Sequence, residues 1–83
     1  MNSDQAQQVA HKAKALYQER YRAMLEETNP GAFVCIEPES GDYFLGATLD
    51  DAVNQAIDVY PDHLTYTLRV GRAAALHLGV FIQ

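Results

Sequence analysis

The sequence has very little cysteine and no long apolar run. Cys35 is the only cysteine among 83 residues, which excludes an internal disulfide and the usual multi-cysteine zinc sites. No apolar stretch reaches the roughly 18 residues of a transmembrane helix, and the opening residues lack the basic and apolar regions of a signal peptide. We therefore expect a cytoplasmic protein that does not associate with a membrane.

Basic residues are absent from the middle of the chain. No lysine or arginine lies between Gly31 and Leu68, and the net charge of the whole chain is −5. The charged residues of this segment are all acidic: Glu37, Glu39, Asp42, Asp50, Asp51, Asp58 and Asp62. Phosphate groups would be repelled here instead of meeting the cationic groove that they need. We therefore expect no nucleic-acid binding through this acidic central module.

What is present is the composition of one small globular domain. Hydrophobic residues make up 48% of the chain and charged residues 20%, which is typical of globular proteins. A chain of this length is near the limit at which a single core suffices, and a partner subunit commonly supplies further burial. We expect residues 1–83 to form a single domain.

Residues 1–28 predict a long amphipathic helix. Its apolar stripe consists of alanine in the first half and of larger side chains in the second: Ala6, Ala10, Ala13, Tyr17, Tyr21 and Met24, flanked by Val9, Leu16 and Leu25. Alanine favours a helix but buries little surface. We therefore expect the second half to dock and the first half to fray or to contact a partner. The run from Thr28 to Gly31 contains Pro30 and should end the helix.

Residues 32–70 predict a ββαβ core. Residues 32–37 and 42–46 each predict a strand, and Gly41 in the turn between them indicates that the two strands form a β-hairpin. The first strand is apolar on both faces, so it needs a cover on each side, from the N-terminal helix or from another subunit. Thr48 and Asp51 match a capping box, and apolar residues at helical spacing continue as far as Tyr60. Residues 64–70 alternate again and predict a strand with one apolar and one polar face.

The C-terminal segment 71–83 predicts a further strand or an extended tail, because apolar residues recur at its even positions up to Ile82. An apolar ending of this kind should be covered by a sheet edge or by a partner. The fold class is therefore α+β. We expect a long N-terminal helix, then a β-hairpin, a helix and one or two further strands, with a small, mainly antiparallel sheet packed on a helix.

Several short motifs of the core carry a resemblance to known proteins. They are Pro38-Glu39-Ser40-Gly41-Asp42-Tyr43, Phe44-Leu45-Gly46, Thr48-Leu49-Asp50-Asp51-Ala52, Tyr60-Pro61-Asp62 and Arg69-Val70-Gly71. This pattern resembles a set of short uncharacterised bacterial proteins. More distantly it is similar to the HicB-like antitoxin domain, whose strands carry an Ile-Glu-Pro segment and whose helix begins with Thr-x-Glu-Glu-Ala.

The chain departs from that domain in two respects. Asp50 and Asp51 stand in place of the glutamates, and no helix-turn-helix or ribbon-helix-helix follows. The absence of such a DNA-binding motif argues against DNA binding and against operon autoregulation. The resemblance implies a small accessory or antitoxin-like protein that pairs with another gene product, and it implies no active site.

Residues that commonly carry catalysis are few. Cys35 with His63 or His77 would supply a thiolate and a base. A cysteine in mid-strand among apolar neighbours is usually an inert small hydrophobe, however. We expect no catalytic residue, and we expect that the protein is not an enzyme.

Two groups of residues are considered as metal ligands. The acids of the hairpin match no calcium-loop spacing: Glu37, Glu39 and Asp42. The histidines stand far apart, so a zinc site would need all of them to converge: His11, His63 and His77. Solvated acids and surface histidines are the expected states, and we expect no metal and no cofactor.

The sequence therefore favours a non-enzymatic, protein-binding module that self-associates. We predict a homodimer, and a neighbour-encoded protein is a second expected partner. The expected contacts come from the N-terminal helix and the C-terminal tail: Tyr17, Tyr21, Met24, Leu25, Val80, Phe81 and Ile82. The alternative is a small-molecule-binding domain that uses the groove between the sheet and the N-terminal helix.

Overall fold

The computed structural model describes residues 3–71 and 77–82 of the chain. The elements follow in the order α1 (Ser3–Leu16), η1 (Tyr17–Tyr21), α2 (Arg22–Thr28), β1 (Phe33–Glu37), β2 (Asp42–Gly46), α3 (Leu49–Val59), β3 (Leu64–Arg69) and β4 (His77–Ile82). The element η1 is a π-helical turn that joins α1 to α2. This order confirms the predicted α+β class, with a fourth strand in the C-terminal segment.

Part of the predicted C-terminal strand or tail cannot be compared with the structure. Residues 72–76 and residue 83 lie outside the described residues, and so do the side chains of residues 77–82. Within the described part of the chain, none of the helices combines the length and the apolar character that crossing a membrane requires.

The strands form one antiparallel sheet in the order β2-β1-β3-β4. Strand β1 is central, because Cys35 lies opposite Phe44 of β2 on one side and opposite Thr67 of β3 on the other. Strand β3 continues the sheet to β4, where Tyr66 pairs with Val80 and the register contains one irregularity. Among the described strands, β2 and β4 are therefore the edges of the sheet.

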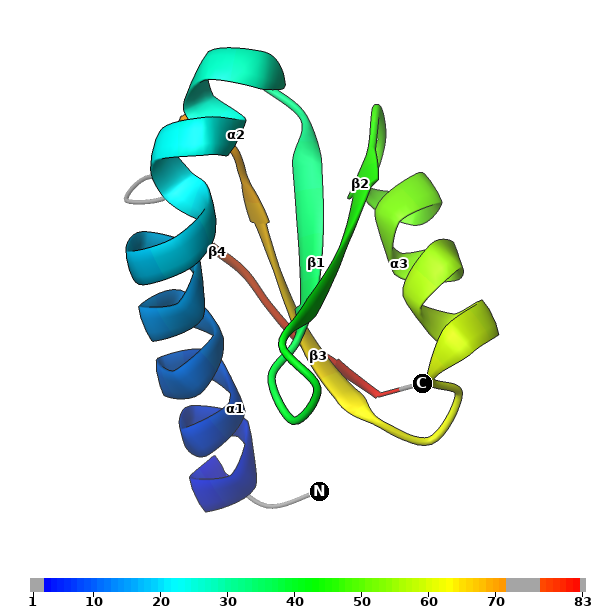
Figure 1. Ribbon diagram of the computed structural model, residues 1–83. Coiled ribbons are helices and arrows are strands. Elements are labelled where there is room, and N and C mark those ends of the chain that lie inside the picture. The colour runs from blue at the N-terminus through cyan, green and yellow to red at the C-terminus, as the bar shows by residue number, and fades with distance from the viewer. Residues whose placement is uncertain (1–2, 72–76, 83) are drawn as a thin grey trace.

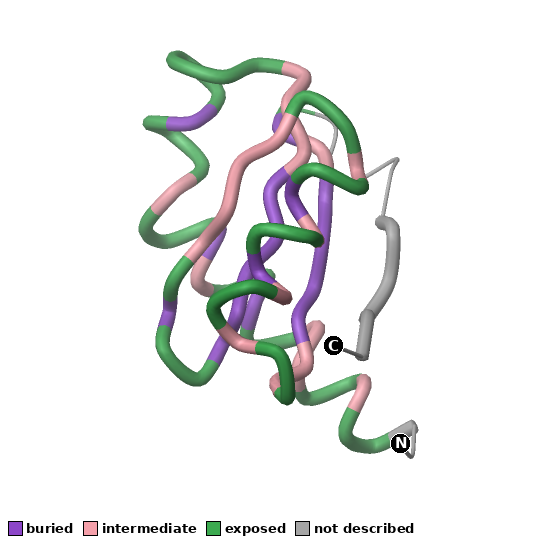
Figure 2. The backbone as a smooth tube through the Cα atoms, turned by 90° about the vertical axis from the view of Figure 1, so that its right-hand side faces the viewer, coloured by how far each residue is buried: buried purple, intermediate pink, exposed green. Residues whose placement is uncertain are grey.

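Helices cover both faces of the sheet. Figure 1 shows α1 and α2 on one side of the strands and α3 on the other. Val34 and Ile36 of β1 belong to a cluster with Tyr17 and Leu25 of the N-terminal helical segment. On the opposite face, Cys35 packs with two buried alanines of α3: Ala52 and Ala56. Figure 2 shows the buried residues gathered on the strands. Both predicted covers of β1 are thus supplied by the same chain.

The π-helical turn changes which residues face the sheet. In an ideal α-helix seven residues make roughly two full turns, so Met24 would follow Tyr17 on the buried face. In the wider π turn the Arg22 amide donates to the Tyr17 carbonyl. This hydrogen bond joins residues five apart instead of four, so the turn contains one more residue than an α-helical turn. Leu25 is consequently buried, whereas Met24 is 42% exposed. The predicted apolar stripe is therefore wrong at Met24, because a regular period does not anticipate a π turn.

The alanine-rich first half of the N-terminal helix also docks, which corrects the expectation that it would fray. Ala13 is fully buried, and Val9 and Ala10 pack against the same core cluster. Helix α1 contacts both β3 and β4. Small side chains bury little area, but they allow a helix to approach a sheet closely, and close packing adds dispersion attraction. The first half of this helix therefore needs no second subunit to cover it.

Helix α3 begins and ends where the local sequence predicts. The Thr48 hydroxyl accepts a hydrogen bond from the Asp51 amide at 3.1 Å, which satisfies one of the free donors of the first turn. At the other end the Tyr60 amide donates to the Ala56 carbonyl at 2.7 Å, and Pro61 follows. The helix packs on β2 and β1 and leaves Tyr60 at the rim of the sheet.

Candidate functional site

Glu37 is an acidic residue buried at the end of β1. Its side chain is 1% exposed and accepts hydrogen bonds from the backbone amides of Glu39 at 2.8 Å and Ser40 at 2.9 Å. The Gly41 amide donates to the Glu37 carbonyl at 2.9 Å. Gly41 has a φ of 82°, a conformation that glycine adopts without strain. The Glu37 carboxylate thus closes the turn between β1 and β2.

His63 is brought beside this carboxylate by the turn between α3 and β3. Its amide donates to the Tyr60 carbonyl at 3.3 Å, and the two rings lie 5.1 Å apart at an angle of 31°. The Tyr60 hydroxyl donates to the Asp42 carboxylate, and the Tyr60 ring meets Phe44 edge-on. Tyr60 therefore fixes the imidazole of His63 next to Glu37.

The Nδ1 atom of His63 faces two carboxylates. It lies 3.3 Å from Oε1 of Glu37 and 3.6 Å from Oε2 of Glu39. One ligand atom from each of these three residues lies within 4.8 Å of the other two. Nδ1 is buried and has no hydrogen-bond partner, so the approach to Glu37 is an ion-pair distance without hydrogen-bond alignment. The Glu39 side chain is 78% exposed, which leaves one side of the cluster open to solvent.

The surroundings of Glu37 lower its pKa. Burial on its own raises the pKa of a carboxyl group, because it disfavours the charged form. The amides of Glu39 and Ser40, the Ser40 hydroxyl and the His63 ring favour the charged form. Together they outweigh burial, so that the pKa of Glu37 lies below its ordinary value of 4.5. Glu37 is therefore a carboxylate at neutral pH.

Replacing Glu37 with glutamine should destabilise the domain and make its stability less sensitive to acid. Because the pKa of Glu37 is lower in the folded state, its contribution is complete above pH 4.5 and is lost as the pH falls through the folded-state value. E37Q should lower the free energy of unfolding by about 1–3 kcal/mol near pH 7. Urea unfolding of wild type and E37Q should show that this difference shrinks below pH 4.5.

The matched control is E39Q, which removes the same charge from an exposed neighbour. E39Q should leave the unfolding midpoint and its pH dependence close to those of wild type. Equal behaviour of the two variants would contradict the role assigned to Glu37.

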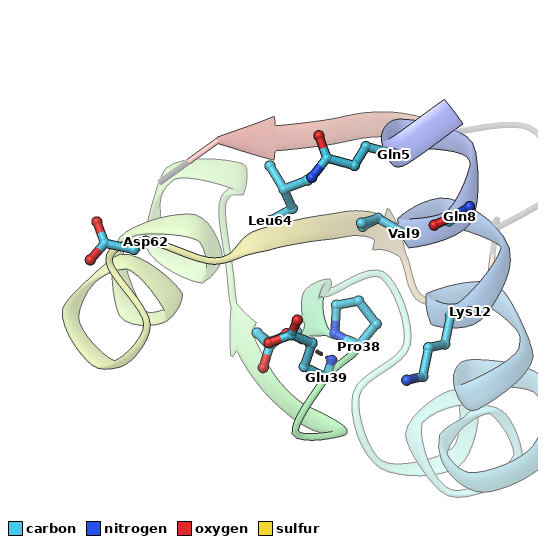
Figure 3. A pocket seen from close by; sticks show the side chains of 9 residues that line it. Gln5, Gln8, Val9, Lys12, Pro38, Glu39, Asp62 and Leu64 are labelled. Atoms are coloured by element: carbon cyan, nitrogen blue, oxygen red, sulfur yellow. Dashed lines mark hydrogen bonds between the residues drawn. The ribbon is translucent and has the colours of Figure 1, made fainter. Parts of the chain in front are cut away.

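A groove of about 320 Å³ adjoins the cluster. Helix α1 forms one wall, and the β1–β2 turn with the start of β3 forms the other (Figure 3). Lys12 extends from the helix, while Glu39 and Asp62 lie on the opposite side (Figure 3). The structure thus contains a groove at the predicted place, between the sheet and the N-terminal helix, with side chains of both charges in its lining.

The residues predicted to form an interface lie in different environments. Tyr17 and Leu25 are 1% and 0% exposed and belong to the core beneath the helix. Tyr21 is half-buried, and it bonds to and packs against the β1–β2 hairpin. Met24, at 42% exposed, is the most exposed member of the helical set among the described side chains. The remaining members lie in β4, outside the described side chains: Val80, Phe81 and Ile82.

Cys35 is buried between the sheet and α3. Burial raises the pKa of its thiol, and the hydroxyls of Thr65 and Thr67 lower it only in part. Both threonines are 0% exposed, so the polar face of β3 is covered as well as the apolar one. A thiol with a raised pKa in such a place is a poor nucleophile.

The cluster combines residues that sequence patterns assigned to separate groups. Glu37 and Glu39 were grouped with Asp42, and His63 was grouped with the other histidines. The grouping fails because β1 and β3 are antiparallel neighbours, so the end of one strand lies beside the start of the other. The sequence signal for the cluster was limited to the positions of two residues: Glu37 ends β1, and His63 directly precedes β3.

Comparisons with protein-family models, with curated proteins and with solved structures found no match to this chain. The resemblance to the HicB-like antitoxin domain therefore stays a prediction from short motifs. The function has to be inferred from the geometry of the chain itself.

Proposed function

We propose that this chain is a small, non-enzymatic cytoplasmic protein that binds a second copy of itself through the outer edge of β4. The observation that supports this best is the position of β4, which ends the sheet and pairs with β3 alone among the strands that the structure describes. The outer edge of such a strand presents unpaired backbone donors and acceptors, which are a template for another strand.

Two kinds of residue that commonly protect a sheet edge are absent from most of β4. Sheet edges are commonly protected by charged side chains or proline, whereas residues 78–82 contain neither. The strand also lies outside the acidic middle of the chain and contains no acidic residue of its own, although each copy has a net charge of −5. Antiparallel pairing of two β4 strands about a two-fold axis would extend the sheet across both chains. The neighbour-encoded partner implied by the resemblance would compete for the same edge.

Hydrogen exchange at several protein concentrations tests where two copies meet. Pairing of β4 with β4 should slow amide exchange in residues 77–82 by about tenfold or more as the concentration rises through the dissociation constant. The amides of α3, which packs mainly on β2 and β1, serve as the internal control and should not change. A dimer whose β4 amides exchange at the same rate at all concentrations would overturn the proposed edge.

A second candidate function is small-molecule binding in the groove beside α1. Its volume of about 320 Å³ lies at the lower end of the range for ligand sites. The presence of Lys12 opposite Glu39 and Asp62 favours a small polar ligand that carries both charges. A compound library screened by thermal melting tests this function, because a ligand that binds the folded state alone raises Tm.

A further inference from the structure

The cluster of Glu37, Glu39 and His63 concentrates electron pairs around one point. Glu37 is ionised at neutral pH, and in the tautomer of His63 that carries its hydrogen on Nε2 the lone pair of Nδ1 points at both carboxylates. Like charges and lone pairs at such distances repel each other. The Nδ1 atom itself is buried, whereas the exposed Glu39 side chain leaves one side of the cluster open to solvent. A hydrogen on Nδ1 would relieve this repulsion, and so would a metal ion bound between the three side chains.

The spacing of the ligand atoms distinguishes among metal ions. Zinc binds nitrogen and oxygen at about 2.0–2.2 Å with tetrahedral geometry, which places its ligand atoms about 3.4 Å apart. The distances from His63 Nδ1 to Glu37 and Glu39 are 3.3 and 3.6 Å. Octahedral magnesium would need neighbouring ligands about 2.9 Å apart, and calcium takes about 6–8 oxygens. One nitrogen and two carboxylates at these separations therefore suit zinc best.

We propose that Glu37, His63 and Glu39 bind a zinc ion, with the fourth coordination position filled by water. The ion would join the β1–β2 turn to the start of β3. This inference does not depend on self-association, because the cluster and the outer edge of β4 share no residue.

Two of the ligands are already held in place. The carboxylate of Glu37 is fixed by the amides of Glu39 and Ser40, and the ring of His63 is held against Tyr60. Such supporting contacts are typical of residues that orient a metal ligand. Glu39 is exposed, and its Oε2 atom already lies 3.6 Å from Nδ1, so only a small adjustment of its side chain is needed to complete the set.

Calorimetric titration of the metal-free protein with zinc chloride tests the site. We expect one zinc ion per chain with a dissociation constant of roughly 10 μM or below, together with a rise in Tm at saturating zinc. The affinity should fall as the pH is lowered, because protons compete for the same ligand atoms. In cobalt-substituted protein, the strong visible absorption of tetrahedral cobalt should appear.

Three variants separate this site from incidental binding. E39Q changes an exposed residue, so the fold should persist while the zinc affinity falls at least about tenfold. D62N removes an equal charge from the residue next to His63, and H11Q removes a histidine on α1; both should stay within about twofold of wild type. The absence of zinc binding at millimolar concentration would overturn the proposal. So would an equal loss of affinity in E39Q and D62N, or a loss in H11Q.

Discussion

An aspartate in place of Ala56 should unfold the domain. Ala56 is 0% exposed and packs with Cys35 and Ala52 in the hydrophobic cluster between α3 and the sheet. An unpaired carboxylate buried there would cost several kcal/mol, whereas a domain of this size has a total stability of about 5–10 kcal/mol. Circular dichroism melts should show a Tm lowered by roughly 15 °C or more, or no folded transition.

The matched control for this variant lies on the same helix. Asn54 is exposed, so Asn54→Asp adds the same charge to the outer side of α3. Its Tm should stay within about 3 °C of wild type, as is usual for surface substitutions. If both variants melted alike, the assignment of Ala56 to the buried side of α3 would be wrong.

A single added methyl group at Gly46 should also destabilise the domain strongly. A Cβ atom there would lie 2.5 Å from the Ala52 nitrogen and 2.6 Å from the Asp51 Cβ. The first of these atoms is backbone, so α3 and β2 would have to move apart. Gly46 is not among the glycines with a positive φ, which means that the effect is steric. We expect G46A to lower the free energy of unfolding by about 3 kcal/mol.

Urea unfolding measures this loss, and the adjacent residue supplies the control. Ala47 is exposed, so A47S should leave the midpoint nearly unchanged. A midpoint for G46A close to that of wild type would show that α3 does not approach β2 as closely as the structure indicates.

The local part of the fold was predictable because its signals are local. The alternation of β1 and β3, the glycine of the hairpin turn and the Thr48 cap each depend on a few adjacent residues. The π-helical turn was not predictable in this way. It exists because Tyr17 and Leu25 both fit the core on one face of the sheet, and that packing compensates for the poorer hydrogen-bond geometry of a π turn.

The candidate site was less predictable than the fold. Glu37 and Glu39 were recognised as hairpin acids, and His63 as a surface histidine, from the sequence. Their convergence depends on the pairing of β1 with β3, which joins segments separated by the whole of α3. Single-residue patterns do not contain information about such non-local pairing.

The structure also changes the reasons for expecting a dimer. The apolar faces of β1 are both covered within one chain, and Ala13 shows that the alanine-rich half of the N-terminal helix docks without a partner. Two of the original reasons are therefore satisfied by the monomer. The third reason was the apolar C-terminal ending, and this segment pairs with β3 at the edge of the sheet. The structure supplies a new reason, because the outer edge of β4 has no neighbour among the described strands.

Light scattering behind a size-exclusion column tests self-association most directly, because it measures the mass without a reference shape. At micromolar concentration we predict a mass near twice the 9.2 kDa of one chain. A mass near 9.2 kDa at every concentration tested would contradict self-association through β4.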